Sequence, residues 1–203
     1  MKIHIEPSFV ITLAILFLTN EPKHVLFMLL TASLHEAGHM ATLFFCKVKI
    51  RTLVLGLFGG TLILEKKLIS YPKEAAVALS GPLVNIFISA ALFFVLRRGF
   101  DADIFFVFLS NASYGIFNLL PIAGLDGGCA LTALLSLKGD LYGSEHIVGV
   151  ISRLTLFLMA AFSLYLVTLS AFNISLFVLT LLFYAESCEG HIISGYEFCR
   201  KTS

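Results

Sequence analysis

Apolar residues occur in long runs along this chain instead of alternating with polar ones. A helix needs about 20 apolar residues to cross the roughly 30 Å hydrocarbon core of a bilayer. Six runs are candidates for such helices, and the first and last are short and could be tilted, buried or extended into the interface. The pattern predicts an all-α integral membrane protein with about six transmembrane helices. The runs are Phe9–Leu18, Val25–Phe45, Ala75–Leu96, Ile104–Leu120 continuing to Leu137, Ile147–Leu169 and Ile174–Ala185.

The stretch between the second and third runs has a different pattern. Thr52–Glu65 contains two runs rich in β-branched and apolar residues on either side of Gly59-Gly60. This arrangement is typical of a hairpin with a glycine turn, so we predict a short membrane-associated β-hairpin there. No repeat or linker interrupts the chain, and the pattern predicts a single polytopic domain over residues 1–203.

Composition excludes several classes of protein. Of the 203 residues, 58% are hydrophobic and 13% are charged, and the mean hydropathy is +0.94. Soluble chains carry about 25% charged residues, so a soluble or disordered domain is excluded. The net charge is +1 without a basic tract, which argues against nucleic acid as a partner. The cysteines have no spacing typical of a disulfide framework or a metal knuckle; they are Cys46, Cys129, Cys188 and Cys199.

Basic residues predict the orientation in the membrane. With six spans, the termini and the loops on their side carry ten Lys and Arg residues, and the opposite loops carry three. Loops rich in Lys and Arg remain in the cytoplasm. Both termini are therefore expected in the cytoplasm.

The second run contains the motif His35-Glu36-Ala37-Gly38-His39. Residues four apart lie on one face of a helix, so both imidazoles can bind the same ion. The H-E-x-x-H motif combines two zinc ligands with a glutamate that takes a proton from water at the metal. We therefore predict His35 and His39 as ligands and Glu36 as general base.

Other interpretations of this motif lead to different classes of protein. Structural histidines are disfavoured, because an unpartnered ionisable group in hydrocarbon costs about 2.5 kcal/mol or more. In a membrane zinc transporter or metal sensor, Glu36 would be a ligand or a proton relay, and a transporter would move ions across the membrane. In a non-catalytic assembly protein, Glu36→Gln would have no effect.

A third ligand is predicted in the fourth run. Catalytic zinc uses three protein ligands and keeps one position open. The remaining histidines lie near chain ends or loops, whereas Asp126 lies where Pro121 and three nearby glycines should break the helix. Irregular backbone at membrane depth survives only where it is buried in protein or lines water. Asp126 is therefore the predicted third ligand.

The expected depth in the membrane supports the same three ligands. His35 and His39 precede Lys47 by 12 and 8 residues, and Asp126 precedes Lys138 by 12. At about 1.5 Å per helical residue, all three lie roughly 12–18 Å from the cytoplasmic end. The ligands are thus expected at one level.

The combination of motifs resembles the site-two protease family of intramembrane zinc metalloproteases. The resemblance rests on the HEAGH motif and on the N-x-x-P-x(4)-D-G segment Asn118–Gly127 in a later run. Ser80–Asn85 is similar to the G-P-x-x-N stretch of the family. Within the family, the chain is similar to the sporulation branch, whose members process an inactive sigma-factor precursor.

The resemblance implies roles for particular residues. One Zn²⁺ ion would be held by His35, His39 and Asp126, with Glu36 as the base. Asn118 would hydrogen-bond the substrate carbonyl or oxyanion, or else satisfy backbone groups at the helix break. The hairpin edge would accept the unwound substrate as an added strand, or would only pack against the bundle. The expected substrate-binding residues are Phe58, which would gate the cleft, Gly59, Gly60 and Asn85.

Partners and location follow from the same resemblance. The expected substrate is a membrane-associated protein cleaved near the cytoplasmic face, with a sigma-factor precursor in sporulation as the leading candidate. An anti-sigma factor or a signal-peptide remnant is the alternative. The lipid bilayer and inhibitory membrane proteins are the other expected partners. The chain is expected in a bacterial cell membrane, including the membrane around a forespore, and without the C-terminal CBS-type domain of that branch.

Overall fold

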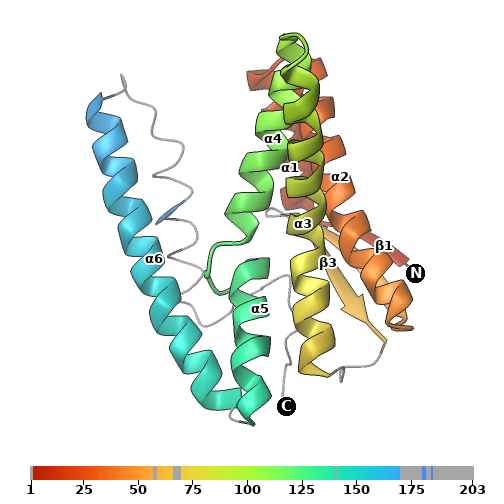
Figure 1. The fold of residues 1–203 in the computed structure, drawn as a ribbon, viewed down its shortest axis with the longest axis vertical. Helices are drawn as coiled ribbons and strands as arrows, with labels where there is room; N and C mark the ends of the chain where they lie inside the picture. The colour runs from red at the N-terminus through yellow and green to blue at the C-terminus, as the bar shows by residue number, and fades with distance from the viewer. Residues whose placement is uncertain are drawn as a thin grey trace.

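The computed structural model describes residues 2–56, 59–65, 70–139 and 141–169, together with residues 180, 181 and 184. This part of the chain is mostly helical and has one small sheet (Figure 1). In chain order the elements are β1 (Lys2–Ile5), α1 (Pro7–Thr19), α2 (Pro22–Phe45), β2 (Ile50–Gly56), β3 (Gly59–Leu64), α3 (Tyr71–Leu96), α4 (Ala102–Asn118), α5 (Asp126–Leu135), the 3₁₀ turn η1 (Ser136–Lys138) and α6 (Leu141–Leu169).

Helix α3 is the centre of the bundle. It packs against α2, α4 and α5, while α6 packs against α5. Figure 1 shows α4 and α5 following one another along the bundle, with a break between them. Helices α2 and α3 come especially close at Gly38, because a Cβ there would lie 2.8 Å from the carbonyl oxygen of Ser80. Small residues permit this kind of contact between membrane helices.

Prolines mark the beginning of three helices. Pro7, Pro22 and Pro72 occupy the first or second position of α1, α2 and α3. Proline suits these positions because its missing N–H would have no partner within the helix. These helices therefore begin a few residues before the apolar runs that predicted them.

The predicted hairpin is confirmed. Strands β2 and β3 pair antiparallel, from Ile50↔Leu64 to Gly56↔Gly59. The expectation of an otherwise all-helical chain is wrong, because β1 adds a third strand that pairs in parallel with β2, in the order β1-β2-β3. The first pair is Lys2↔Thr52, and partners so far apart in sequence leave no local pattern that predicts their pairing.

Polar side chains are buried in the bundle, and large apolar ones are exposed. Asn85 and Asn111 are both 0% exposed, whereas Phe45 on α2 and Phe87 on α3 are 81% and 76% exposed. Lipid accepts exposed apolar side chains, and polar contacts help to hold helices together inside a membrane. The distribution is typical of a helical membrane protein.

Within the described residues, two helical segments are long and apolar enough to cross a membrane, namely α3 and Leu141–Leu166 of α6. Helices α1 and α5 are apolar but shorter. Six transmembrane helices therefore remain a prediction. The last apolar run, Ile174–Ala185, lies almost entirely outside the described residues.

The predicted helix break in the fourth apolar run is confirmed between α4 and α5. In the connecting loop, Gly124 has a φ of 100°, a conformation that favours glycine. Helix α6 covers this loop: Leu156 packs against Ile122, and the hydroxyl of Ser152 accepts a hydrogen bond from the N–H of Ala123 at 3.0 Å. The irregular backbone is thus packed against protein, with Ile122 and Leu125 buried and the other loop residues partly buried.

Candidate metal centre

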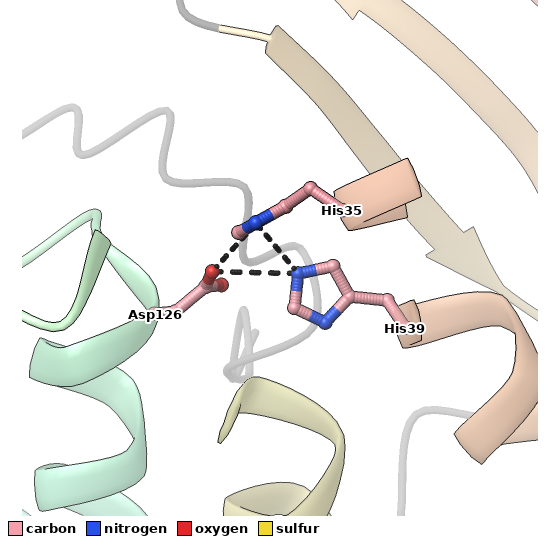
Figure 2. A group of neighbouring side chains, drawn as sticks. All are labelled: His35, His39 and Asp126. Carbon is pink, nitrogen blue, oxygen red and sulfur yellow. Dashed lines mark hydrogen bonds and ion pairs between the residues drawn. The ribbon is translucent and has the colours of Figure 1, made fainter. Parts of the chain in front are cut away.

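The three predicted ligands lie together where α2 meets the beginning of α5, as Figure 2 shows. His35 and His39 are one turn apart on α2, and their Nε2 atoms are 3.1 Å apart. Oδ2 of Asp126, the first residue of α5, is 2.9 Å from Nε2 of His35 and 3.4 Å from Nε2 of His39. His35 and His39 are only 3% and 8% exposed. One ligand atom from each residue therefore converges on a single buried point.

Hydrogen bonds at the far nitrogens orient both imidazoles. Nδ1 of His35 is 2.7 Å from Oδ1 of Asn85, and Nδ1 of His39 is 2.8 Å from the carbonyl oxygen of Val77. Because both partners are acceptors, each neutral imidazole carries its proton on Nδ1. Both Nε2 lone pairs then face each other and the carboxylate of Asp126, an arrangement that needs a cation among them.

This set of donors fits zinc. Two imidazole nitrogens and one carboxylate oxygen are the protein ligands of one common type of catalytic zinc site, which leaves a position open for reaction. Ligating histidines usually donate their other N–H to a carbonyl or carboxylate, as these two do. The residues present therefore match the metal that the sequence motif predicts.

Gly81 of α3 keeps clear the space beside both imidazoles. A Cβ at this position would lie 2.4 Å from Nε2 of His39 and 2.8 Å from Nε2 of His35. Real Cβ atoms essentially never approach other atoms closer than 3.0 Å. Any other residue at position 81 would therefore displace the ligands.

Glu36 lies beside the hairpin. Its carboxylate accepts a hydrogen bond from the backbone N–H of Gly60 in β3. A Cβ on Gly60 would lie 2.8 Å from Cδ of Glu36, so the strand approaches the predicted base through a residue without a side chain. Phe58 lies outside the described residues, and Gly59 is described only as the first residue of β3.

Asn85 and Asn118 differ in how the structure places them. Asn85 is 0% exposed and lies behind His35, with its Oδ1 toward Nδ1 of that imidazole, and its contact with a substrate stays a prediction. Asn118 donates a hydrogen bond from Nδ2 to the carbonyl oxygen of Tyr114, one turn earlier, at 3.0 Å. This bond is the alternative in which Asn118 satisfies a backbone group near the helix break. The role of Asn118 toward a substrate stays a prediction.

Three further residues around the site do not follow from the motifs. The ring of Tyr114 meets that of His35 edge-on, with centroids 4.9 Å apart, and Asn111 and Thr31 contact Asn85. Asn111 carried a signal in the sequence, because a polar residue inside an apolar run is often functional. Thr31 carried none, since threonine in a membrane helix commonly bonds to its own helix.

No family model matches the chain, but individual proteins are similar to it in sequence and in fold. Stage IV sporulation protein FB of Bacillus subtilis is 35% identical over 143 residues, which are 67% of this chain and 48% of that protein. A zinc metalloprotease of Methanocaldococcus jannaschii is 34% identical over 164 residues, 76% of this chain and 47% of that protein. The solved site-2 protease from Methanocaldococcus jannaschii matches with a TM-score of 0.68 at 25% identity, covering 92% of this chain and 89% of that one. The chain belongs to the site-2 protease family.

The family resemblance predicted from the motifs is thereby confirmed. This site-2 protease homologue shares the fold of the solved structure over nearly its whole length. It spans about half the length of the curated relatives it matches.

Proposed function

We propose that this site-2 protease homologue is an intramembrane zinc metalloprotease that hydrolyses peptide bonds of membrane-associated proteins near the cytoplasmic face. The observation that carries this proposal is the buried convergence of His35 Nε2, His39 Nε2 and Asp126 Oδ2 within 4.8 Å of one another. The names of its relatives, a zinc metalloprotease and a site-2 protease, support the same chemistry.

The roles of the residues follow from their positions. His35, His39 and Asp126 would hold one zinc ion. When bound, zinc supplies Lewis acidity, which makes water nucleophilic near neutral pH and polarises a carbonyl group. Glu36 accepts the proton of the attacking water and gives it to the leaving amine. The N–H of Gly60 holds the Glu36 carboxylate in place by a hydrogen bond.

The hairpin is the proposed substrate-binding element. A substrate must unwind before cleavage, because helical amides in lipid are enclosed by their own hydrogen bonds. In the described part of the chain β3 is an edge strand of the sheet, as β1 is, and it contains Gly60 beside Glu36. An added substrate strand along β3 would therefore reach the base, with Phe58 as a gate and Asn118 directed at the oxyanion.

Topology, location and substrate complete the proposal. The chain crosses a bacterial cell membrane six times, with both termini in the cytoplasm, consistent with its basic loops. Similarity to a sporulation protein supports a sigma-factor precursor as substrate and a forespore membrane as one location. An anti-sigma factor or a signal-peptide remnant is the alternative substrate, and inhibitory membrane proteins are proposed partners.

Glu36→Gln tests the function in purified full-length protein. Zinc content is measured by elemental analysis, and cleavage of co-expressed candidate substrates by mass spectrometry. Glu21→Gln is the matched control, because Glu21 is the exposed residue just before the first turn of the same helix, far from the site. A general base typically contributes 10²- to 10⁴-fold, so we expect a loss of cleavage of about that size with zinc retained.

Three outcomes would contradict the proposal. These are wild-type cleavage by the Glu36→Gln variant, purified protein without zinc, and a loss of cleavage that the Glu21→Gln control shares. Zinc flux in vesicles without proteolysis would indicate a transporter instead.

A further inference from the structure

A chain of buried polar groups runs from α4 through α3 to the His35 ligand on α2. Nδ2 of Asn111 is 2.9 Å from the carbonyl oxygen of Val107, and Oδ1 of Asn111 is 3.0 Å from Nδ2 of Asn85. Oδ1 of Asn85 is then 2.7 Å from Nδ1 of His35. Both asparagines are 0% exposed, and His35 is 3% exposed. Bulk water therefore cannot replace any of these partners.

Backbone carbonyls determine the direction of every bond in this chain. A carbonyl can only accept, so the group of Asn111 that faces Val107 is its NH₂, and the other end of this amide is its oxygen. That oxygen requires a donor, so Asn85 presents its NH₂ to Asn111 and its own oxygen to His35. Nδ1 of His35 must consequently donate.

Thr31 of α2 provides a second anchor for both amides. Nδ2 of Asn85 is 3.2 Å from the carbonyl oxygen of Thr31, and Nδ2 of Asn111 is 3.2 Å from its hydroxyl. If the Asn85 amide rotated by 180°, its oxygen would face the oxygens of Thr31 and Asn111 with no proton between them. Buried acceptors without donors are strongly unfavourable, so the network opposes this rotation.

His39 does not depend on this network. Its Nδ1 donates to the carbonyl oxygen of Val77 at 2.8 Å, and a backbone carbonyl cannot exchange its acceptor for a donor. The two imidazoles are therefore oriented by different means, one by backbone and the other by side chains from two neighbouring helices. This difference provides a control within the same molecule.

We propose that Asn85 and Asn111 are positioning residues that keep the proton of the neutral His35 imidazole on Nδ1 and its Nε2 lone pair toward Asp126. The G-P-x-x-N stretch thus acts through one face of α3, with Gly81 clearing space for the ligands and Asn85, one turn later, orienting one of them. The part of this inference that concerns zinc affinity rests on the proposed function.

Three variants separate orientation of His35 from general packing. Asn85→Leu removes the acceptor of the His35 N–H. Asn111→Leu removes one of the two acceptors that hold the NH₂ of Asn85 and leaves the carbonyl oxygen of Thr31 as the other. Ser89→Ala is the matched control, because Ser89 is 6% exposed and donates to the carbonyl oxygen of Phe108 at 3.3 Å, also between α3 and α4.

Two measurements are made on each full-length variant. The zinc dissociation constant is obtained by competition with a chelator, and ¹⁵N NMR of the metal-free protein reports which imidazole nitrogens carry a proton. Loss of such an outer partner typically weakens metal binding 10- to 100-fold, which we expect for Asn85→Leu and, to a lesser degree, for Asn111→Leu. His35 should leave the Nδ1–H form in Asn85→Leu and, in part, in Asn111→Leu, while His39 keeps it. Ser89→Ala should remain close to wild type in both measurements.

Specific results would overturn the proposal. One is an Asn85→Leu variant that binds zinc as tightly as Ser89→Ala and keeps the proton of His35 on Nδ1. Another is an Asn85→Leu variant in which the proton position of His39 changes as much as that of His35, because then the substitution disturbs the site as a whole. Wild-type protein that binds no zinc would overturn the proposed function alone, since the proton position in metal-free His35 still tests the network.

Discussion

Replacing Gly81 with alanine adds one methyl group where α3 faces both histidine ligands. The new Cβ would lie 2.4 Å from Nε2 of His39 and 2.8 Å from Nε2 of His35. Ordinary contact begins at 3.4 Å, so these atoms must retreat by about 1.0 Å and 0.6 Å. The α3 backbone cannot move away from α2 without losing the close contact at Gly38.

The displacement is large on the scale of metal coordination. Zinc–nitrogen bonds are about 2.0–2.1 Å long, and a functional site holds its distances within about 0.2 Å. The rings also cannot shift freely, because Asn85 and Val77 hold their Nδ1 atoms. We expect Gly81→Ala to raise the zinc dissociation constant at least about 100-fold, equivalent to roughly 2.8 kcal/mol of binding free energy.

The assay compares zinc affinity, by chelator competition, with cleavage of a membrane-associated substrate. Gly149→Ala is the matched control, because it is also a glycine-to-alanine change within a helix and its Cβ would meet nothing within 4 Å. The control should keep its zinc affinity and its activity. Wild-type zinc affinity in Gly81→Ala would show that the site does not need the space that glycine leaves.

Further substitutions test other parts of the site. Asp126→Asn should lower zinc occupancy in elemental analysis and abolish cleavage, because a neutral amide is a poorer ligand than a carboxylate, and full occupancy would contradict the ligand assignment. Gly60→Ala should displace the flexible end of Glu36 and lower kcat with unchanged zinc content; an unchanged kcat would argue against a role for their contact. Ser152→Ala removes the acceptor of a loop N–H and should lower the free energy of unfolding by about 1–3 kcal/mol. Thermal denaturation measures this loss of stability. Ser163→Ala is the control: it removes a hydrogen bond within α6 only and should lower the free energy of unfolding by less.

Local sequence rules were sufficient where the geometry itself is local. The spacing of His35 and His39 places both on one helix face whatever surrounds the helix. Pro121 and the neighbouring glycines break the fourth run without help from other elements, which leaves Asp126 at the beginning of α5. The hairpin was predictable for the same reason, because its two strands are joined by a short turn.

Contacts between distant segments were not predictable from the sequence. Strands β1 and β2 pair although α1 and α2 lie between them in the sequence. Strand β1 has only four residues, too few for a periodicity that would predict its partner. The motif that contains Asn85 says nothing about which neighbour its side chain meets. The structure places it behind His35, where its amide connects to Asn111 of α4.

By itself, the sequence determined a membrane protein with two histidines and a glutamate on one helix and a carboxylate at a helix break, because apolar length and helical spacing are properties of neighbouring residues. Only the tertiary structure decided that α5 brings Asp126 to the two imidazoles, that Gly81 leaves room for them, and that Asn85 orients one of them. These depend on how α2, α3 and α5 pack, and packing joins residues whose distance along the chain carries no information about their distance in space.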